Sequence, residues 1–576
     1  MNVRNRWFLI LAGLLASVLV FAAACGGDDD DGDGGDQTPS ATQPAGGNGE
    51  TAPADQQNIT IQSGEPQFLD PHRSNFEQDI GVIRMMFRGL YNLTDDGGGG
   101  VEVVPGMAEG DPVVEGNVYT VTLKEGLLWS DGEPITAQNF VDGAKRGCDP
   151  TVAETYGYLW GAGYLDLVGC AEVQANTDAA QKQTLLDAMQ VRAVDERTVE
   201  YTLKQPNDRF TTIMALWVTF PARQDVIDAN GDAWTQPENI VNNGPFVLSE
   251  LTPGESLKLV PNPNWAGQAP ALQEITVRFI DDLAAAFRGY QNDELQMTRI
   301  SATDIVVVEG DSGLSSELLQ VPSGRIESLE MQMEDETLAD FNVRLALSRA
   351  IDREALNEAV FDGTNQPALY WVVEGITGHQ GNEPFTDIIG FDEEAAKAAL
   401  AEAGYPGGDG FPELGIIVNT PERIAVAEFL QQQFSEILGI DIRIEQVDGQ
   451  TRSARFNAED FDLFVGGWQL DYPDIENPLF GLFETTGGNN KYNCSHPDVD
   501  AALEAALAAT DDEARIAAYQ DMETAIVTNL CGVAPMYQSS LPFLVASRVG
   551  GVVPNGTIDA GQPGNYCAEC WFVKAE

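Results

Sequence analysis

Strand-like and helix-like segments alternate along most of this chain, and this alternation restricts its fold more than any other feature. Val199–Leu203 and Glu274–Ile280 alternate apolar and polar residues with the period of a half-buried strand. Ala425–Leu438 repeats apolar residues at helical spacing, and the strand-like Asp441–Glu445 follows it. Strands separated by helices predict an α/β fold, and the ~520 residues after the first 57 are too many for one core. The sequence therefore predicts two or three lobes.

The first 25 residues have the layout of a secretory signal. Met1–Arg6 is short and positively charged, Trp7–Ala24 is an apolar run, and three alanines precede Cys25. A membrane-spanning helix is the alternative, because the run is at the lower length limit for one. The position of Cys25 resembles the lipobox of bacterial lipoproteins, although Ala22 stands where that family usually has Leu. The resemblance implies a signal peptide over 1–24 and an acylated Cys25 that anchors the protein in membrane lipid at the outer face of the cytoplasmic membrane, in the periplasm or at the cell surface.

Residues 25–57 contain almost nothing that could form a core and predict a disordered acidic tether. Their Asp cluster lacks the spacing and terminal Glu of an EF-hand, so we expect no metal there, and no other pattern calls for a cofactor. The net charge of −59 argues against nucleic acid as a partner, because phosphates require clustered Lys and Arg. We expect most of this charge to form a solvated surface.

Six cysteines remain if Cys25 is acylated, and an even number outside the cytosol predicts disulfides. Several connectivities are possible, and pairs close in sequence are favoured. The Cys-x-x-Cys motif near the C-terminus would suit a redox pair or half of a zinc site, but no second such motif exists, so a structural bridge is favoured. The favoured pairs are Cys148 with Cys170, then Cys494 with Cys531, and Cys567 with Cys570.

Separated blocks from about residue 59 to the end resemble the peptide-binding branch of the family 5 extracellular solute-binding proteins. The most specific block is Trp129–Ala137, in which Asp131-Gly132 fits a tight turn and Thr136 is expected to cap a helix that starts near Ala137. The other blocks follow in the family's order: Leu69–His72, Phe87–Tyr91, Leu123–Gly126, Trp234–Val241, Asn243–Phe246, Asn262–Trp265, Asn342–Leu347, Ala350–Arg353, Ala395–Lys397, Ala403–Pro406, Phe461–Asp462, Gly467–Trp468, Asp471–Asp474 and His496–Asp500.

This resemblance implies a two-lobed α/β fold of the periplasmic-binding-protein type (type II, the large peptide-binder class) with an extra subdomain on the first lobe. It places the first lobe at 58–327, with the inserted subdomain at about 94–210. The second lobe would cover 328–535, and the chain would return to the first lobe over 536–576.

The same resemblance implies that the protein acts as a monomer, captures a peptide between the lobes and delivers it to the permease subunits of an ABC importer. A peptide can pair with the protein as an added strand, and its terminal ammonium requires a carboxylate. In the family, that acid stands three residues after the Trp of a Gly-Trp-x-x-Asp segment. Asp471 occupies this position here and is the leading candidate, although it could also be a loop acid that caps the helix after Pro473.

Other residues of the same segment, and one loop of the first lobe, are further candidates for ligand contact. The alternatives are a Trp in the core and an ordinary surface loop. The loop lies where the family's peptide-pairing strand does. These candidates are Gly467, Trp468, Gln469, Asn75, Phe76 and Glu77.

The partner of the ligand's carboxylate stays open. The family's oligopeptide binder has a basic residue where this chain has Val465, and Arg452 and Arg455 lie nearby but align only with a gap. A non-peptide solute (a sugar, an opine or a metal chelate) and delivery to a sensor are therefore alternatives within the same fold.

A secreted hydrolase is the alternative from another class of protein. The histidines His72, His379 and His496 form no His-Glu-x-x-His motif for zinc. The chain also lacks the Gly-x-Ser-x-Gly turn of serine hydrolases and a phosphate-binding lysine loop. We therefore expect a binding protein and not an enzyme.

Overall fold

The computed structural model describes residues 51–575 apart from 75, 154, 162 and 510. The expected signal peptide, Cys25, most of the expected tether and Asn75 lie outside the described residues. Within the described part of the chain, no helix combines the length and the apolar character needed to cross a membrane.

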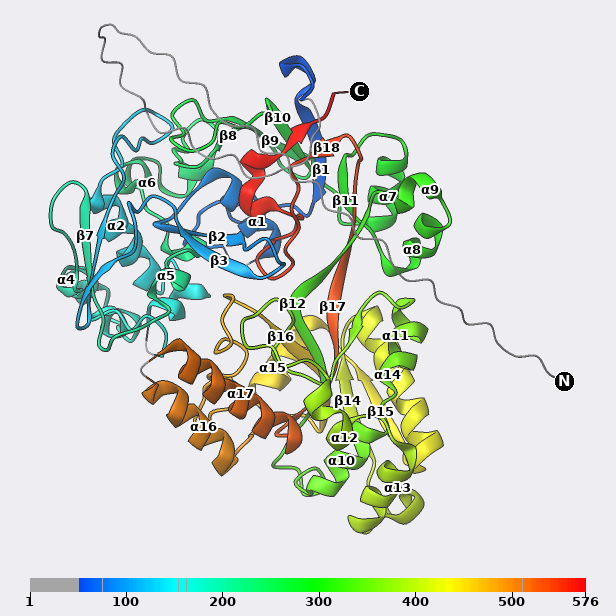
Figure 1. The fold of residues 1–576 in the computed structure, drawn as a ribbon. Helices are drawn as coiled ribbons and strands as arrows, with labels where there is room; N and C mark the ends of the chain where they lie inside the picture. The colour runs from blue at the N-terminus through cyan, green and yellow to red at the C-terminus, as the bar shows by residue number, and fades with distance from the viewer. Residues whose placement is uncertain (1–50, 75, 154, 162, 510, 576) are drawn as a thin grey trace, which may run out of the picture. The chain divides into compact units, whose positions relative to one another are not determined.

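One large mixed sheet runs through the fold. Its two longest strands, β12 (Leu318–Met331) and β17 (Val533–Val545), are antiparallel neighbours near the middle of the sheet and lie side by side in Figure 1. The strand order is β15 (Ile442–Gln446), β14 (Leu414–Val418), β16 (Leu463–Gln469), β12, β17, β11 (Met297–Arg299), β1 (Asn58–Ser63), β10 (Glu274–Phe279), β9 (Ser256–Pro261) and β8 (Phe246–Thr252), and β13 (Gln366–Pro367) pairs with β17.

Buried apolar side chains gather mainly in two large cores. The first core draws on residues 52–297 and 549–573 together with Tyr472, and the second on residues 326–537. We call residues 51–317 and 546–575 the first lobe and residues 332–532 the second lobe, and β12 and β17 belong to both. The alternation of strands and helices is thus arranged as a two-lobed α/β fold, as expected.

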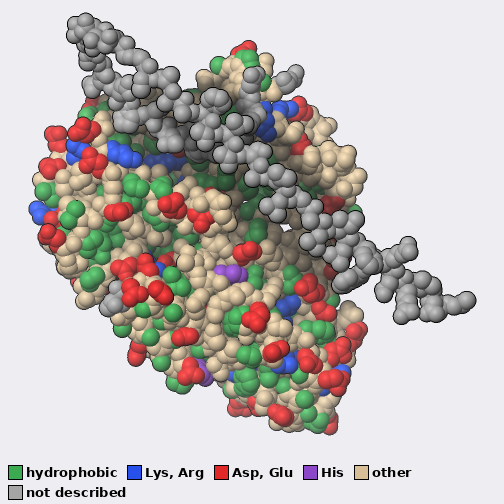
Figure 2. Space-filling view, in the orientation of Figure 1, with side chains coloured by type: hydrophobic (Ala, Val, Ile, Leu, Met, Phe, Trp, Pro, Cys, Tyr) green, Lys and Arg blue, Asp and Glu red, His purple; other side chains and the backbone are tan. Residues whose placement is uncertain are grey.

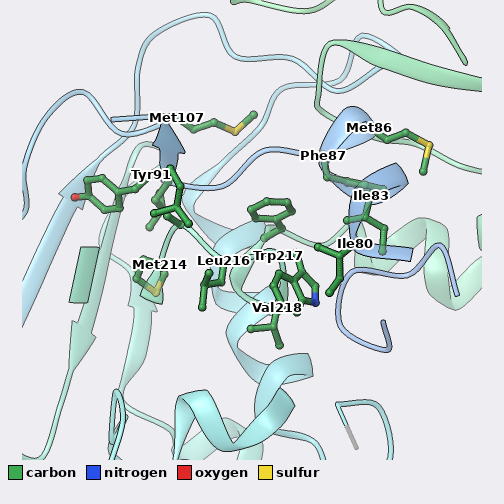
Figure 3. Close-up of a cluster of buried hydrophobic side chains, with 14 of the residues drawn as sticks. Ile80, Ile83, Met86, Phe87, Tyr91, Met107, Met214, Leu216, Trp217 and Val218 are labelled. Atoms are coloured by element: carbon green, nitrogen blue, oxygen red, sulfur yellow. The ribbon is translucent and has the colours of Figure 1, made fainter. Parts of the chain in front are cut away.

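In the first lobe, helix α1 (Glu77–Met86) is largely buried, with seven of its ten residues buried. Ile80 on this helix lies beside Trp217 in Figure 3, and both side chains are buried. The other elements of this lobe are β2 (Tyr91–Asp95), β3 (Val101–Pro105), α6 (Gln224–Asn230), α7 (Leu283–Gln291), α8 (Ala302–Glu309), α9 (Ser312–Ser315), β18 (Val549–Gly550) and β19 (Phe572–Val573).

An inserted subdomain (residues 113–213) has a sheet of its own. Helix α2 (Ala137–Cys148) starts where the sequence predicts, because the Asn139 side chain accepts a 2.9 Å hydrogen bond from the Thr136 backbone N–H in a capping box. The expected start near 94 lies inside β2, since residues 91–105 form a separate hairpin. The sheet has the order β4 (Val113–Glu115), β5 (Val118–Thr122), β7 (Thr198–Thr202) and β6 (Val191–Ala193), with helices α3 (Cys170–Gln174), α4 (Ala179–Ala188) and α5 (Phe210–Ile213).

The second lobe is built on the parallel strands β14, β15 and β16. Every residue of β14 is buried, as expected for a parallel strand that is covered on both faces. Figure 1 shows the helices of this lobe packed around the strands. They are α10 (Phe341–Arg349), α11 (Arg353–Phe361), α12 (Thr386–Ile389), α13 (Glu393–Glu402), α14 (Pro421–Gln433), α15 (Gly449–Asn457), α16 (Pro497–Ala508) and α17 (Asp512–Thr528).

The expected boundaries at 327/328 and 535/536 fall inside β12 and β17, so the chain changes lobe in the middle of two paired strands. The expected end of the tether at residue 57 is wrong. Ala52 and Gln57 are buried, and the Gln57 side chain donates a 2.9 Å hydrogen bond to the backbone carbonyl of Val573. Residues 51–57 therefore belong to the fold and pack against the C-terminal strand β19.

The three favoured disulfides, Cys148–Cys170, Cys494–Cys531 and Cys567–Cys570, are confirmed. The first closes a loop with a sequence separation of 22 residues, and a cross-link over such a loop contributes about 3 kcal/mol in the chain-entropy model. Asp and Glu side chains are scattered over the face in Figure 2 and do not gather in one patch. The acidity is thus spread over a solvated surface on this face.

Candidate functional site

Asp471 stands two residues after β16 and faces the inserted subdomain. The hydroxyl of Tyr158 donates a 2.6 Å hydrogen bond to Oδ2 of Asp471, across 313 residues of sequence. Tyr158 lies in a short 3-10 segment, Tyr156–Trp160, which follows α2. The leading candidate from the sequence is therefore at a contact between the first and second lobes.

Asn477 holds the turn that carries Asp471. Its side-chain oxygen accepts a 2.9 Å hydrogen bond from the indole N–H of Trp468 and a 3.1 Å bond from the backbone N–H of Asp471. Asp474 in the same turn forms an ion pair with Arg515, with two N–H···O distances of 2.9 and 3.0 Å. Asp471 and Trp468 are thus oriented by a rigid, hydrogen-bonded loop.

Burial controls the ionisation of this site. Removal from water raises the pKa of the Asp471 carboxyl to about 6, although hydrogen bonds from Tyr158 and Asn477 act in the opposite direction. Burial likewise raises the pKa of the Tyr158 and Tyr164 hydroxyls, that of Tyr164 to about 12. At neutral pH the site therefore holds one carboxylate among neutral phenols, which favours a positively charged group.

A pocket of about 580 Å³ opens on one side of Asp471. The inserted subdomain and the second lobe both line it, and most of its large side chains are aromatic. We call it the aromatic pocket. Its described lining residues are Thr155, Tyr156, Tyr158, Gly163, Tyr164, Trp468, Asp471, Phe480, Gly481, Glu484, Thr486, Gly487, Gly488 and Asn489.

A second pocket of about 230 Å³ shares Tyr156 and Asp471 with the first. We call it the backbone pocket, because Gln469 at the end of β16 and Leu470 directly after it line it. The first lobe closes its other side. The remaining described lining residues are Glu77, Ile80, Arg84, Leu93, Trp217, Tyr472, Pro473, Thr557, Ile558, Asp559 and Ala560.

The structure brings four of the sequence-based candidates to these pockets: Asp471, Trp468, Gln469 and Glu77. Gly467 lines neither; a Cβ at this position would lie 1.9 Å from the backbone oxygen of Ile326, so the close approach of β12 requires glycine. The loop expected to contact the ligand is described at Phe76 and Glu77 only. Phe76 is an exposed residue that precedes α1, and Glu77 is the first residue of that helix.

Arg452 and Arg455 lie outside both pockets. The Arg452 guanidinium lies 4.0 Å from the centre of the Phe464 ring and donates to the Val465 carbonyl, whereas Arg455 pairs with Glu445 at 2.6 Å. Arg452 also adjoins two buried acids of β12, Glu327 and Glu330, and burial raises the pKa of Glu330 to about 8. Among the described residues, no group of three or more His, Cys, Asp or Glu side chains is placed to hold a metal ion.

Sequence reasoning missed the tyrosines and Asn477. The segment from Tyr156 to Tyr164 holds four aromatic residues between Cys148 and Cys170, and this concentration in a disulfide-closed loop was the available signal. Arg84, which lines the backbone pocket, could not be identified from the sequence, because a charged residue at its position is ordinary in an amphipathic helix such as α1. Asn477 could be found only from the folded turn.

The chain matches a family model described as bacterial extracellular solute-binding proteins, family 5 Middle, over residues 102–490. The probable deoxycholate-binding periplasmic protein YgiS of Escherichia coli is 29% identical over 84% of this chain and 89% of its own. The periplasmic murein peptide-binding protein MppA of E. coli is 29% identical over 88% and 92%.

Solved structures show the same similarity. MppA in its unliganded open form matches with a TM-score of 0.76 and 26% identity, over 92% of this chain and 99% of that one. OppA of Burkholderia pseudomallei matches with a TM-score of 0.71 and 25% identity, over 90% and 100%. These relatives are named as binding proteins and not as enzymes.

Proposed function

The chain belongs to family 5 of the bacterial extracellular solute-binding proteins, and on this premise we propose that it captures peptides outside the cytoplasm and delivers them to the permease of an ABC importer. The named functions of its relatives support a peptide as the ligand, MppA being a murein peptide-binding protein. The chain itself would bind and release its ligand and catalyse no reaction.

The contact between Tyr158 and Asp471 carries this proposal. The half-buried carboxylate of Asp471 has a raised pKa, and no Lys or Arg is among the described residues that line the aromatic pocket. The α-ammonium of a peptide would supply a positive charge at this point and donate hydrogen bonds to the desolvated carboxylate of Asp471. Closure of the two lobes would then remove the pair from water.

The backbone pocket can hold the main chain of a bound peptide. It is bounded by Gln469 and Leu470 at the end of β16 and by Glu77 and the loop 557–560 of the first lobe. An extended ligand next to β16 can exchange backbone hydrogen bonds with it, which satisfies groups common to every peptide. We therefore propose Asp471, Trp468, Gln469 and Glu77 as ligand contacts, with the first lobe (51–317 and 546–575) and the second lobe (332–532) as the halves that close.

The proposed membrane anchor and location of the protein rest on its sequence. We propose that Cys25 is acylated and holds the mature protein on the outer face of the membrane, near the permease. The described fold begins at Thr51, which forms an isolated β-bridge with Lys574.

Identification of the natural ligand by mass spectrometry tests the function most simply. The soluble form, without its first 25 residues, is purified under native conditions, and bound molecules are released by denaturation. The proposal expects short peptides with free amino termini. A bile acid such as deoxycholate, a sugar or a metal chelate in their place would overturn it.

A further inference from the structure

We propose that the aromatic pocket accepts a second positive charge, so that the preferred ligands are peptides whose first side chain is that of lysine or arginine. This inference rests on the proposed function and names the ligand class of the same site. Three properties of the pocket carry it: its aromatic walls, its charges and its position relative to Asp471.

Five aromatic rings form the walls of the pocket. The Tyr158 and Tyr164 rings have centroids 4.8 Å apart and an interplanar angle of 68°, and the Tyr164 and Phe480 rings are 6.1 Å apart at 80°. Rings at such angles present both faces and edges to one space. The face of an aromatic ring carries partial negative charge and attracts a cation placed over it. Tyr156 and Trp468 complete the set.

The charges of the described lining residues have one sign. Asp471 and Glu484 are the only ionisable acids among them, and the same set contains no Lys, Arg or His. Glu484 is half-buried, and its Oε1 accepts a 3.2 Å hydrogen bond from the Thr486 hydroxyl. The α-ammonium of the ligand would neutralise Asp471. Glu484 would then be left as the carboxylate for a second cation.

The two pockets would hold different parts of the ligand, its first side chain and its backbone. Both pockets include Asp471 and Tyr156, so a ligand ammonium at Asp471 stands where they meet. The lining of the backbone pocket includes a cation, Arg84, together with the acids Glu77 and Asp559, and its volume of about 230 Å³ is well below the 580 Å³ of the aromatic pocket, whose described lining holds no Lys or Arg. The first side chain of a basic peptide therefore points into the aromatic pocket.

The volume of the pocket agrees with this assignment. About 580 Å³ exceeds the space that a lysine or arginine side chain fills, and the remainder accommodates water around its head group. A cation that keeps part of its hydration shell while it contacts aromatic rings and a carboxylate loses little solvation free energy when it leaves bulk water.

Two tripeptides that differ only in charge test the inference. Isothermal titration calorimetry compares Lys-Ala-Ala with norleucine-Ala-Ala, in which a hydrogen replaces the side-chain ammonium and the four side-chain carbons are kept. We expect the lysine peptide to bind at least tenfold more tightly at pH 7.5 and low salt, with a smaller ratio at 0.5 M salt. Glu484→Gln should reduce this ratio about three- to tenfold, mainly by weakening the binding of the lysine peptide.

The matched control is Glu504→Gln, an exposed acid on α16 outside the pocket lining, which should preserve the ratio. Equal affinity of the native protein for both peptides, or a preference for norleucine, would overturn the inference and leave the proposed function intact. Binding of neither peptide would count against the proposed function itself. The comparison on the native protein decides the matter even if Glu484→Gln fails to fold.

Discussion

The 2.6 Å hydrogen bond from the hydroxyl of Tyr158 to Oδ2 of Asp471 joins the inserted subdomain to the second lobe. One partner is fixed by a disulfide-closed loop, and the other by a turn that Asn477 and Arg515 hold. The carboxylate that would receive the ligand's ammonium is therefore part of the contact between the lobes, and a ligand at this point affects their closure directly.

Tyr158→Phe removes only the hydroxyl of this contact. Because a hydrogen bond to a charged group contributes about 1.5–3 kcal/mol, affinity for a free-amine peptide at pH 7 should fall roughly tenfold to a hundredfold. The pKa of Asp471 should rise, since the bond from Tyr158 lowers it. Calorimetry across pH measures both effects, with Tyr405→Phe, outside both pockets, as the control. Unchanged affinity together with an unchanged pH profile would rule out this role.

Ligand binding should weaken as the pH falls through about 6. The ammonium of a peptide stays protonated over this range, whereas Asp471 becomes neutral below its pKa of about 6. The dissociation constant of a neutral-side-chain peptide should therefore rise about tenfold from pH 7 to pH 5. Asp471→Asn should make the profile flat. A native profile that is flat over this range would contradict the assignment.

Without ligand, the same carboxyl should lower the stability of the fold. The pKa of this carboxyl in the folded protein is above the ordinary value of 3.8. Its contribution to the free energy of unfolding therefore falls as the pH rises from about 4 to 6 and stays low above pH 6. Asp471→Asn should therefore raise the melting temperature of the unliganded protein at pH 7.5, although it abolishes tight binding. Thermal unfolding followed by circular dichroism checks this. A lower melting temperature would indicate a structural role in place of a binding role.

A second contact between the lobes is a buried ion pair. It joins Arg209, which precedes α5, to Glu476 in the second lobe, and the two side chains are 13% and 3% exposed. Glu476→Gln leaves the Arg209 charge without its partner, which should cost about 3–5 kcal/mol of unfolding free energy in urea. The exposed pair of Lys397 and Glu394 provides the control, because Glu394→Gln should cost less than about 0.5 kcal/mol. Equal, small effects of both changes would show that the buried pair does not hold the lobes.

Sequence patterns predicted the alternation of elements, the start of α2 and the three disulfides, because each depends on residues close together in the chain. The resemblance to the family pointed to Asp471, which stands three residues after Trp468. Tyr158 could not be assigned to the site in this way, since 313 residues separate it from Asp471. Glu77 was expected near a pairing strand but begins a helix, because the apolar residues that follow it repeat at helical spacing.

The most direct test of the account compares tri-alanine with N-acetyl-tri-alanine as ligands of the native protein and of Asp471→Asn. Calorimetry at pH 7.5 should show that the substitution weakens tri-alanine binding by about 2–5 kcal/mol, while the acetylated peptide loses less than about 0.7 kcal/mol. Asp409→Asn, at an exposed position in the second lobe, should change neither value. Equal losses for the two peptides would contradict the claim that Asp471 receives the ligand's ammonium.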